Sequence, residues 1–298
     1  MKTYVKLLLT ALFWGGTFVA GRIVAQDLAP FSIAFLRFAI ASAFLLLLTW
    51  KLEGTLPFVP PSGGPAKAGT PNLITLVALG MTGIFTYNVL FFKGLKLIEA
   101  SRASLIVATC PVFIALGSAL FMKEKIGLIK GLGVIISVCG AGVVVSKGSI
   151  GEVFKGGLGR GELYILCCVL CWVAYSLIGK AAMKSLSPLV CVSYSAVIGT
   201  LALLVPAAFE GLVANVWHVS FVDWLCIFYL GVFGTVIGFV WYYQGVERLG
   251  PTKAGLFINF VPIFAILSAL LILGEAVTLS LAVGAAMVIS GAYLTNRR

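Results

Sequence analysis

The chain has 298 residues, of which 61% are hydrophobic and only 10% are charged, and its mean hydropathy is +1.11. Soluble domains carry about 25% charged residues, so this composition excludes an ordinary soluble enzyme. The formal net charge of +11 comes from Lys and Arg residues scattered singly near the ends of apolar runs. That distribution favours membrane topology over nucleic-acid binding.

Apolar runs of about 18 to 20 residues are long enough to cross the hydrocarbon core as helices. Ten such runs follow one another, four of them interrupted by one basic residue. The sequence predicts an all-α integral membrane protein, multi-pass in the lipid bilayer, with ten transmembrane helices. In chain order the predicted spans are Leu7–Ala25, Pro30–Trp50, Ala68–Phe92, Ala103–Phe121, Ile126–Ser146, Leu163–Ala182, Ser185–Phe209, Trp224–Val246, Ala254–Gly274 and Ala276–Asn296.

The distribution of basic residues predicts the orientation. Lys and Arg accumulate in cytoplasmic loops. With the N-terminus inside, most basic residues fall on the cytoplasmic side, and the segments after Lys180 on the other side carry no Lys or Arg. Both termini are therefore expected in the cytoplasm, with the chain in the cell membrane.

The second half of the chain repeats the first. Trp14 aligns with Trp172 at a shift of 158 positions, and Pro111 aligns with Pro262 at a shift of 151, together with several glycines. The difference between the two shifts fits a longer Pro- and Gly-rich loop in the first half.

The repeat predicts two related five-span units, residues 1–147 and 161–298, joined by a linker over residues 148–160. Because five is an odd number, the second unit must enter the membrane from the opposite side. Inverted repeats of this kind are typical of transporters, whose substrates bind near the membrane midplane where the halves meet.

The repeated prolines lie near the middle of their spans. Pro111 and Pro262 should each break a helix and release the carbonyl four residues earlier. Unpaired carbonyls at this depth are tolerated where they are buried in protein or face a cavity. Thr109 and Asn259 stand beside these breaks and are candidate binding groups. A packing kink satisfied by neighbouring helices is the alternative.

Two carboxylates follow the proline-containing runs at equal spacing. Glu124 and Glu275 lie just before the predicted fifth and tenth spans. At the N-terminus of a helix a carboxylate is stabilised by the helix dipole. We expect a structural role for both, with proton or substrate handling as the alternative.

At this point the sequence resembles a known family. The segments "ASRASLIVATCPVFIALGSALFMKEKIGLIKGLGVIISVCGAGVVV" and "GPTKAGLFINFVPIFAILSALLILGEAVTLSLAVGAAMVISGAYL" are similar to the repeated domain of the EamA family of the drug/metabolite transporter superfamily. The early "FWGG" and the "FLRF" of the second span match as well. The resemblance implies a ten-helix transporter of small organic solutes such as amino acids, often directed outward, and it does not identify the substrate. Ser195 stands where the first half has Arg37, so the halves are not equivalent.

Arg37 is the only basic residue well inside a predicted span. A charge at this depth should face the bundle or a cavity. It could bind a substrate carboxylate, or it could pair structurally with a backbone carbonyl or water.

The remaining candidates for a substrate-binding wall are aromatic or amphipathic residues in the middle of spans. Cavity lining and core packing both remain open for the two repeat-related tryptophans. These candidates are Trp14, Tyr87, Asn88, Trp172, Tyr175 and Trp241.

Several other classes of function find no support in the sequence. No catalytic cluster, metal motif, nucleotide-binding loop or cofactor motif is present, so neither an enzyme nor ATP-driven transport is expected. No carboxylate lies in the middle of a span, which favours exchange or facilitated diffusion over proton coupling. The alternative is a multidrug or cation exporter coupled to protons. The Gly-rich helices could pack within the chain or form a homodimer.

Overall fold

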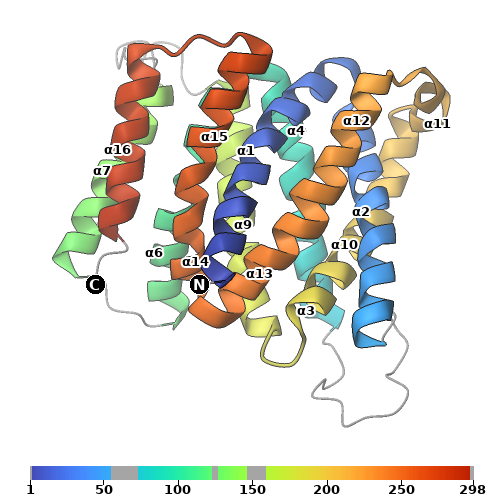
Figure 1. Cartoon of the computed structure of the whole chain (residues 1–298), viewed down its shortest axis with the longest axis horizontal. Helices are drawn as coiled ribbons and strands as arrows, with labels where there is room; N and C mark the ends of the chain where they lie inside the picture. The colour runs from blue at the N-terminus through green and yellow to red at the C-terminus, as the bar shows by residue number, and fades with distance from the viewer. Residues whose placement is uncertain (1, 55–72, 123–126, 146–158, 296–298) are drawn as a thin grey trace.

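The computed structural model describes residues 2–54, 73–122, 127–145 and 159–295, and the regular structure in these ranges is helical (Figure 1). This confirms the predicted all-α class. The helices of the first half are α1 (Lys2–Asp27), α2 (Pro30–Glu53), α3 (Leu73–Leu79), the π-helix η1 (Gly80–Thr86), α4 (Tyr87–Leu97), α5 (Ala100–Val107), α6 (Cys110–Met122) and α7 (Leu128–Val145).

The second half has a similar order of helices. They are α9 (Arg160–Ala182), α10 (Pro188–Phe209), α11 (Leu212–Asn215), the 3-10 helix η2 (Val216–His218), α12 (Phe221–Tyr229), the π-helix η3 (Leu230–Ile237), α13 (Gly238–Leu249), α14 (Pro251–Gly255), the 3-10 helix η4 (Leu256–Phe260), α15 (Val261–Ser268), the π-helix η5 (Ala269–Leu273) and α16 (Leu279–Thr295).

Within the described residues, eight helical stretches are long and apolar enough to cross a membrane, and they correspond to eight of the ten predicted spans. The fifth and tenth predicted spans correspond to the shorter apolar helices Gly131–Val144 and Leu279–Gly291. The count of ten spans therefore stays a prediction. Most of the linker over residues 148–160 and the start of the third predicted span lie outside the described residues.

Local sequence signals set several helix boundaries. Pro30 lies in the first turn of α2, where its missing N–H costs nothing, and Gly54 ends the helix at a φ of 64°. The seventh span begins at Pro188, later than predicted, because the Ser187 hydroxyl accepts the Val190 N–H at 3.2 Å and caps α10.

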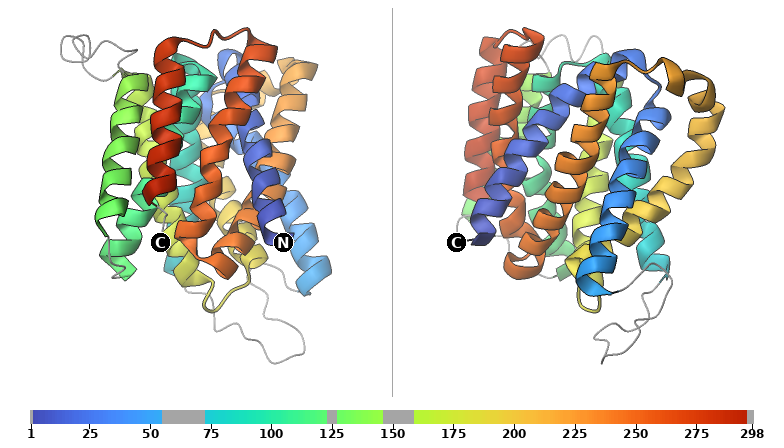
Figure 2. Two further views of the ribbon diagram at one scale, coloured as in Figure 1. Left: turned by 60° about the vertical axis from the view of Figure 1, so that its left-hand side comes forward. Right: turned by 45° about the vertical axis from the view of Figure 1, so that its right-hand side comes forward.

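Helices α7 and α16 pack side by side at one edge of the molecule (Figures 1 and 2). Glycines allow this close approach. A Cβ added at Gly140 would lie 2.8 Å from the Val288 nitrogen and 3.0 Å from the Gly284 oxygen. Small residues at such crossings are typical of helix packing in membranes.

Helices α2 and α10 run antiparallel, and the end of each contacts the start of the other. At one end, Glu210 accepts the backbone N–H groups of Phe31 and Ser32 at 2.8 and 3.1 Å. At the other end, the Ser187 hydroxyl donates to both carboxylate oxygens of Glu53, at 2.7 and 2.8 Å. Each helix therefore ends in a carboxylate that contacts the start of the other.

Candidate functional site

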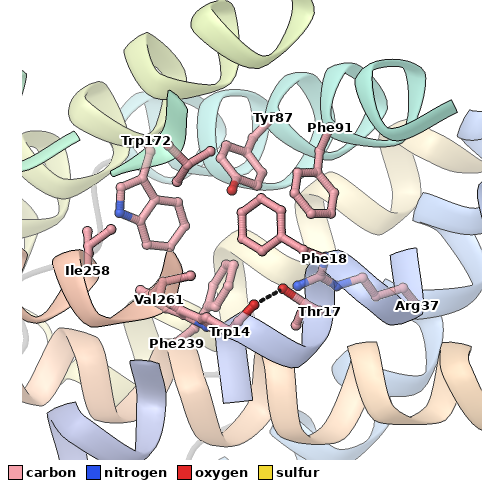
Figure 3. A pocket seen from close by; sticks show the side chains of 11 residues that line it. Trp14, Thr17, Phe18, Arg37, Tyr87, Phe91, Trp172, Phe239, Ile258 and Val261 are labelled. Atoms are coloured by element: carbon pink, nitrogen blue, oxygen red, sulfur yellow. Dashed lines mark hydrogen bonds between the residues drawn. The ribbon is translucent and has the colours of Figure 1, made fainter. Parts of the chain in front are cut away.

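An internal cavity lies among α1, α2, α4, α5, α9, α13, η4 and α15 (Figure 3). Its volume is about 30 Å³, and aromatic and apolar side chains form most of its wall. The lining residues are Trp14, Thr17, Phe18, Arg37, Tyr87, Phe91, Val107, Trp172, Phe239, Ile258 and Val261. An apolar wall with a few placed polar groups is typical of small-molecule sites, although at about 30 Å³ this cavity must widen before it holds an organic solute.

Aromatic rings hold one another in place around the cavity. The rings of Trp14 and Trp172 meet edge to face with centroids 5.1 Å apart. Tyr87 lies 5.4 Å from the Trp172 ring and stacks on Phe91 at 5.8 Å. The two repeat-related tryptophans thus contact each other directly, at a position that both halves share.

Arg37 brings a full positive charge to this wall. Its side chain is only 3% exposed. Its Nε donates to Thr235 Oγ1 at 3.0 Å and its Nη1 donates to Asn88 Oδ1 at 2.9 Å. Both partners are neutral, and within the described residues no carboxylate forms an ion pair with Arg37.

The two groups that hold Arg37 are placed by π-helical segments, since Asn88 lies in the first turn of α4 directly after η1 and Thr235 lies within η3. In η1, widened turns leave the carbonyls of Gly83 and Ile84 to accept the Asn88 amide, at 3.2 and 2.8 Å. In η3, the Thr235 hydroxyl donates to the Leu230 carbonyl at 3.0 Å. Asn88 and Thr235 therefore use their donors on the backbone and keep an oxygen for Arg37. Single π-helical turns occur often at functional sites.

A second hydrogen bond fixes Trp14. Its indole Nε1 donates to the Gly234 carbonyl of η3 at 2.9 Å. The Thr17 hydroxyl donates to the Trp14 carbonyl at 2.6 Å, as Figure 3 shows, and the Arg37 guanidinium lies close to Thr17 in that view. The same π-helical segment thus orients both the indole and the guanidinium.

Four of the predicted binding residues line the cavity, namely Trp14, Arg37, Tyr87 and Trp172. Asn88 does not line the cavity, but its side-chain oxygen accepts a hydrogen bond from the Arg37 guanidinium. The other predicted residues, Thr109, Tyr175, Trp241 and Asn259, do not line this cavity.

Local bonding and helix rotation account for those four positions. Thr109 donates to the Ile106 carbonyl at 2.7 Å within the helix break. Tyr175 packs 4.9 Å from Tyr243, and its hydroxyl lies 3.3 Å from Ser195 Oγ. Trp241 lines a separate surface depression, and Asn259 is buried with its Oδ1 lacking a hydrogen-bond partner within the described residues.

The prolines lie where the helices are interrupted. Pro111 is in the first turn of α6, after a break at residues 108–109, and Pro262 is in the first turn of α15, after the 3-10 helix η4. Val107 and Ile258, whose carbonyls the prolines were expected to release, both line the cavity.

Glu275 caps a helix other than the one that the sequence indicated. Its Oε1 accepts the Ala100 N–H at 2.8 Å, and its Oε2 accepts the Ser101 N–H at 2.9 Å and the Ser101 hydroxyl at 2.5 Å. These groups belong to the start of α5, in the other half of the chain. Gly274 ends η5 at a φ of 66°, so Glu275 lies in the connection before α16 and not in the first turn of that helix. Glu124 lies outside the described residues.

Sequence reasoning missed several residues of the site. Thr235 accepts a hydrogen bond from Arg37. Thr17 lines the cavity next to Arg37, and Phe239 forms part of its aromatic wall. The repeated glycines of "GMTGIFT" and "LGVFGTVI" coincide with the two π-helical segments, and were the available signal for Thr235.

Comparisons with known proteins agree with this architecture. A sequence model of the EamA-like transporter family matches residues 1–146 and 159–297. The "Uncharacterized transporter YyaM" of Bacillus subtilis (strain 168) is 28% identical over 291 residues, covering 98% of this chain and 92% of its own. An uncharacterized transporter of Archaeoglobus fulgidus is 27% identical over 303 residues, covering all of both chains. A solved crystal structure of a protein shares the fold, with a TM-score of 0.68, 21% identity, and coverage of 99% of this chain and 97% of the other.

Proposed function

The chain belongs to the EamA-like transporter family, and from this premise we propose that it exports small organic metabolites such as amino acids across the cell membrane. The family and the relatives named above are transporters, not enzymes. The observation that carries the substrate proposal is Arg37, a buried cation with neutral partners in the wall of an aromatic cavity.

Transport would proceed by alternating access between two inverted repeats, residues 1–147 and 161–298. Contacts between repeat-related positions support this. Trp14 contacts Trp172. Gly94 lies against Ile165, and Gly245 lies against Leu7, so closely that an added Cβ would meet each of these side chains.

These two contacts are related by the repeat. Gly245 is 151 positions after Gly94, and Ile165 is 158 positions after Leu7, which are the two shifts that align the halves of the sequence. Two such halves exchange conformations at little cost, because each already contains the packing that the other adopts. The residues that hold Arg37 come from both halves, so the site would change when the halves move.

Both termini are assigned to the cytoplasm on the distribution of basic residues. The described ends of the chain lie toward the same end of the molecule (Figure 1), as this orientation requires. In the described residues no carboxylate lines the cavity, which supports exchange or facilitated diffusion and disfavours the alternative of a proton-coupled cation exporter.

Counterflow in proteoliposomes tests this function. Vesicles with the purified full chain are loaded with a mixed amino-acid pool, and labelled amino acids are added outside one at a time without an ion gradient. We expect exchange of one or a few of them. Arg37→Gln should abolish exchange while folded protein remains in the membrane, and normal kinetics in that variant would remove Arg37 from the site.

A further inference from the structure

The cavity is unbalanced in charge. Among the described residues that line it, Arg37 is the only charged one. The carboxylates that the structure describes lie at helix ends or in loops, where Glu210 and Glu275 cap helices and Glu162 pairs with Arg102 at 2.8 Å. Asp223 lies in the first turn of α12, where the Ser220 hydroxyl accepts its N–H and donates to its carboxylate. A ligand therefore meets one cation and no anion in the described wall.

The guanidinium has capacity left for an anion. Arg has five N–H donors, and Arg37 uses one on Thr235 and one on Asn88. The remaining donors belong to Nη1 and Nη2, and Figure 3 shows this end of the side chain beside Thr17 and Phe18. Two parallel donors at the end of a guanidinium match the two oxygens of a carboxylate.

An ammonium group finds no comparable partner. Moving it from water into this cavity without a carboxylate is unfavourable. Aromatic faces can attract cations, but the large rings are engaged with one another. Trp14 meets Trp172 at an interplanar angle of 87°, and Trp172 meets Phe239 at 74° with centroids 5.1 Å apart.

We propose that the site selects amphipathic monocarboxylates that lack an ionised amine, with an aromatic or branched apolar body, in preference to zwitterionic amino acids of the same shape. This inference rests on the proposed transport function and, among small organic metabolites, favours monocarboxylates over the amino acids given there as the example. When the cavity widens to admit the ligand, the carboxylate neutralises Arg37, and the apolar body contacts the ring of Phe18 and the wall formed by Tyr87 and Phe91. Amino acids with the same body are exchanged weakly.

Three ligands with one body and different charges test the proposal. These are 3-phenylpropionate, phenylalanine and phenethylamine, which carry a net charge of −1, 0 and +1 at neutral pH. Binding to the detergent-purified full chain is measured by tryptophan fluorescence, since Trp14 and Trp172 line the cavity. We expect phenylpropionate to bind at least tenfold more tightly than phenylalanine, and phenethylamine to bind more weakly than either.

Arg37→Gln should reduce phenylpropionate affinity at least tenfold and remove the preference over phenylalanine. The matched control is Arg22→Gln, because Arg22 bonds to the Leu95 carbonyl and does not line the cavity. The comparison of the three ligands uses the chain without substitutions, so it tests the proposal even if one of the two variants fails to fold.

The outcomes separate this inference from the proposed function. Equal or tighter binding of phenylalanine, or binding of none of the three, overturns the substrate class, and counterflow of amino acids would still support transport. Tightest binding of phenethylamine overturns it in favour of a cation exporter. Selective binding of phenylpropionate without its counterflow supports the site and contradicts the transport function.

Discussion

Ser42 and Thr200 are 158 positions apart in the sequence, and their hydroxyl oxygens lie 3.0 Å apart between α2 and α10. The Thr200 hydroxyl donates to the Ala196 carbonyl at 2.7 Å, so Ser42 is the donor between them. The spacing is the one that relates Trp14 to Trp172. Residues at repeat-related positions of the sequence therefore contact each other at two places in the bundle.

Removing the Ser42–Thr200 hydrogen bond should have a small and shared effect on stability. Hydrogen bonds between helices in membranes contribute about 0.6 kcal/mol on average. We expect Ser42→Ala and Thr200→Val each to lower the free energy of unfolding by about that amount. The double variant should lose no more than either single one, as measured by unfolding in mixed detergent micelles. If the losses of the two single variants add up in the double variant, the contact between Ser42 and Thr200 contributes nothing to the free energy of unfolding.

The glycines of the α7–α16 crossing provide a matched pair for substitution. A Cβ at Gly140 would meet α16 at contact distances that force a shift, whereas Gly142 on the same helix has nothing within 4 Å. We expect Gly140→Ala to lower stability by about 1–3 kcal/mol through overpacking. Gly142→Ala should be neutral or raise stability by up to about 1 kcal/mol through helix propensity. Equal melting temperatures for the two variants would contradict this packing.

The Glu275 carboxylate should stabilise the start of α5. It accepts two backbone N–H groups and one hydroxyl, and loss of a capping acceptor costs about 0.5–2 kcal/mol. We expect Glu275→Ala to lower the melting temperature and Glu275→Gln to lower it less, since Gln keeps one acceptor oxygen. Glu247→Gln, at an exposed position of α13, is the control and should leave the melting temperature unchanged.

A carboxylate placed beside Arg37 should compete with an anionic substrate. Thr17 lines the cavity next to Arg37. We expect Thr17→Asp to pair with the guanidinium and lower the affinity for a carboxylate ligand at least tenfold. Its isostere Thr17→Asn, which has the same size and no charge, should lower it much less. Ligand titration by fluorescence measures both, and an equal loss in the two variants would assign the effect to shape and not to charge.

Much of the fold follows from the sequence because it depends on features that are read along the chain. Apolar length predicts spans, so the eight long helices were located with shifts of a few residues at their ends. Burial of Arg37 also follows, because a charge in the middle of an apolar run must be shielded from lipid.

Other features depend on contacts between distant segments. The rotation of each helix about its axis decides which of its polar residues reach the cavity, and it placed Thr109 and Trp241 elsewhere. The partner of Glu275 could not be predicted because it lies 174 to 175 positions away, in the other half.

The sequence by itself indicated a helical membrane protein whose second half repeats the first in sequence, with a cation in its interior, because composition, apolar length and repetition are properties of the chain alone. Only the tertiary structure decided what surrounds that cation. Asn88 in α4 and Thr235 in the π-helical segment η3 reach Arg37 from opposite halves. Their placement arises from backbone geometry and packing between segments that are far apart in sequence, which leaves no local pattern to read.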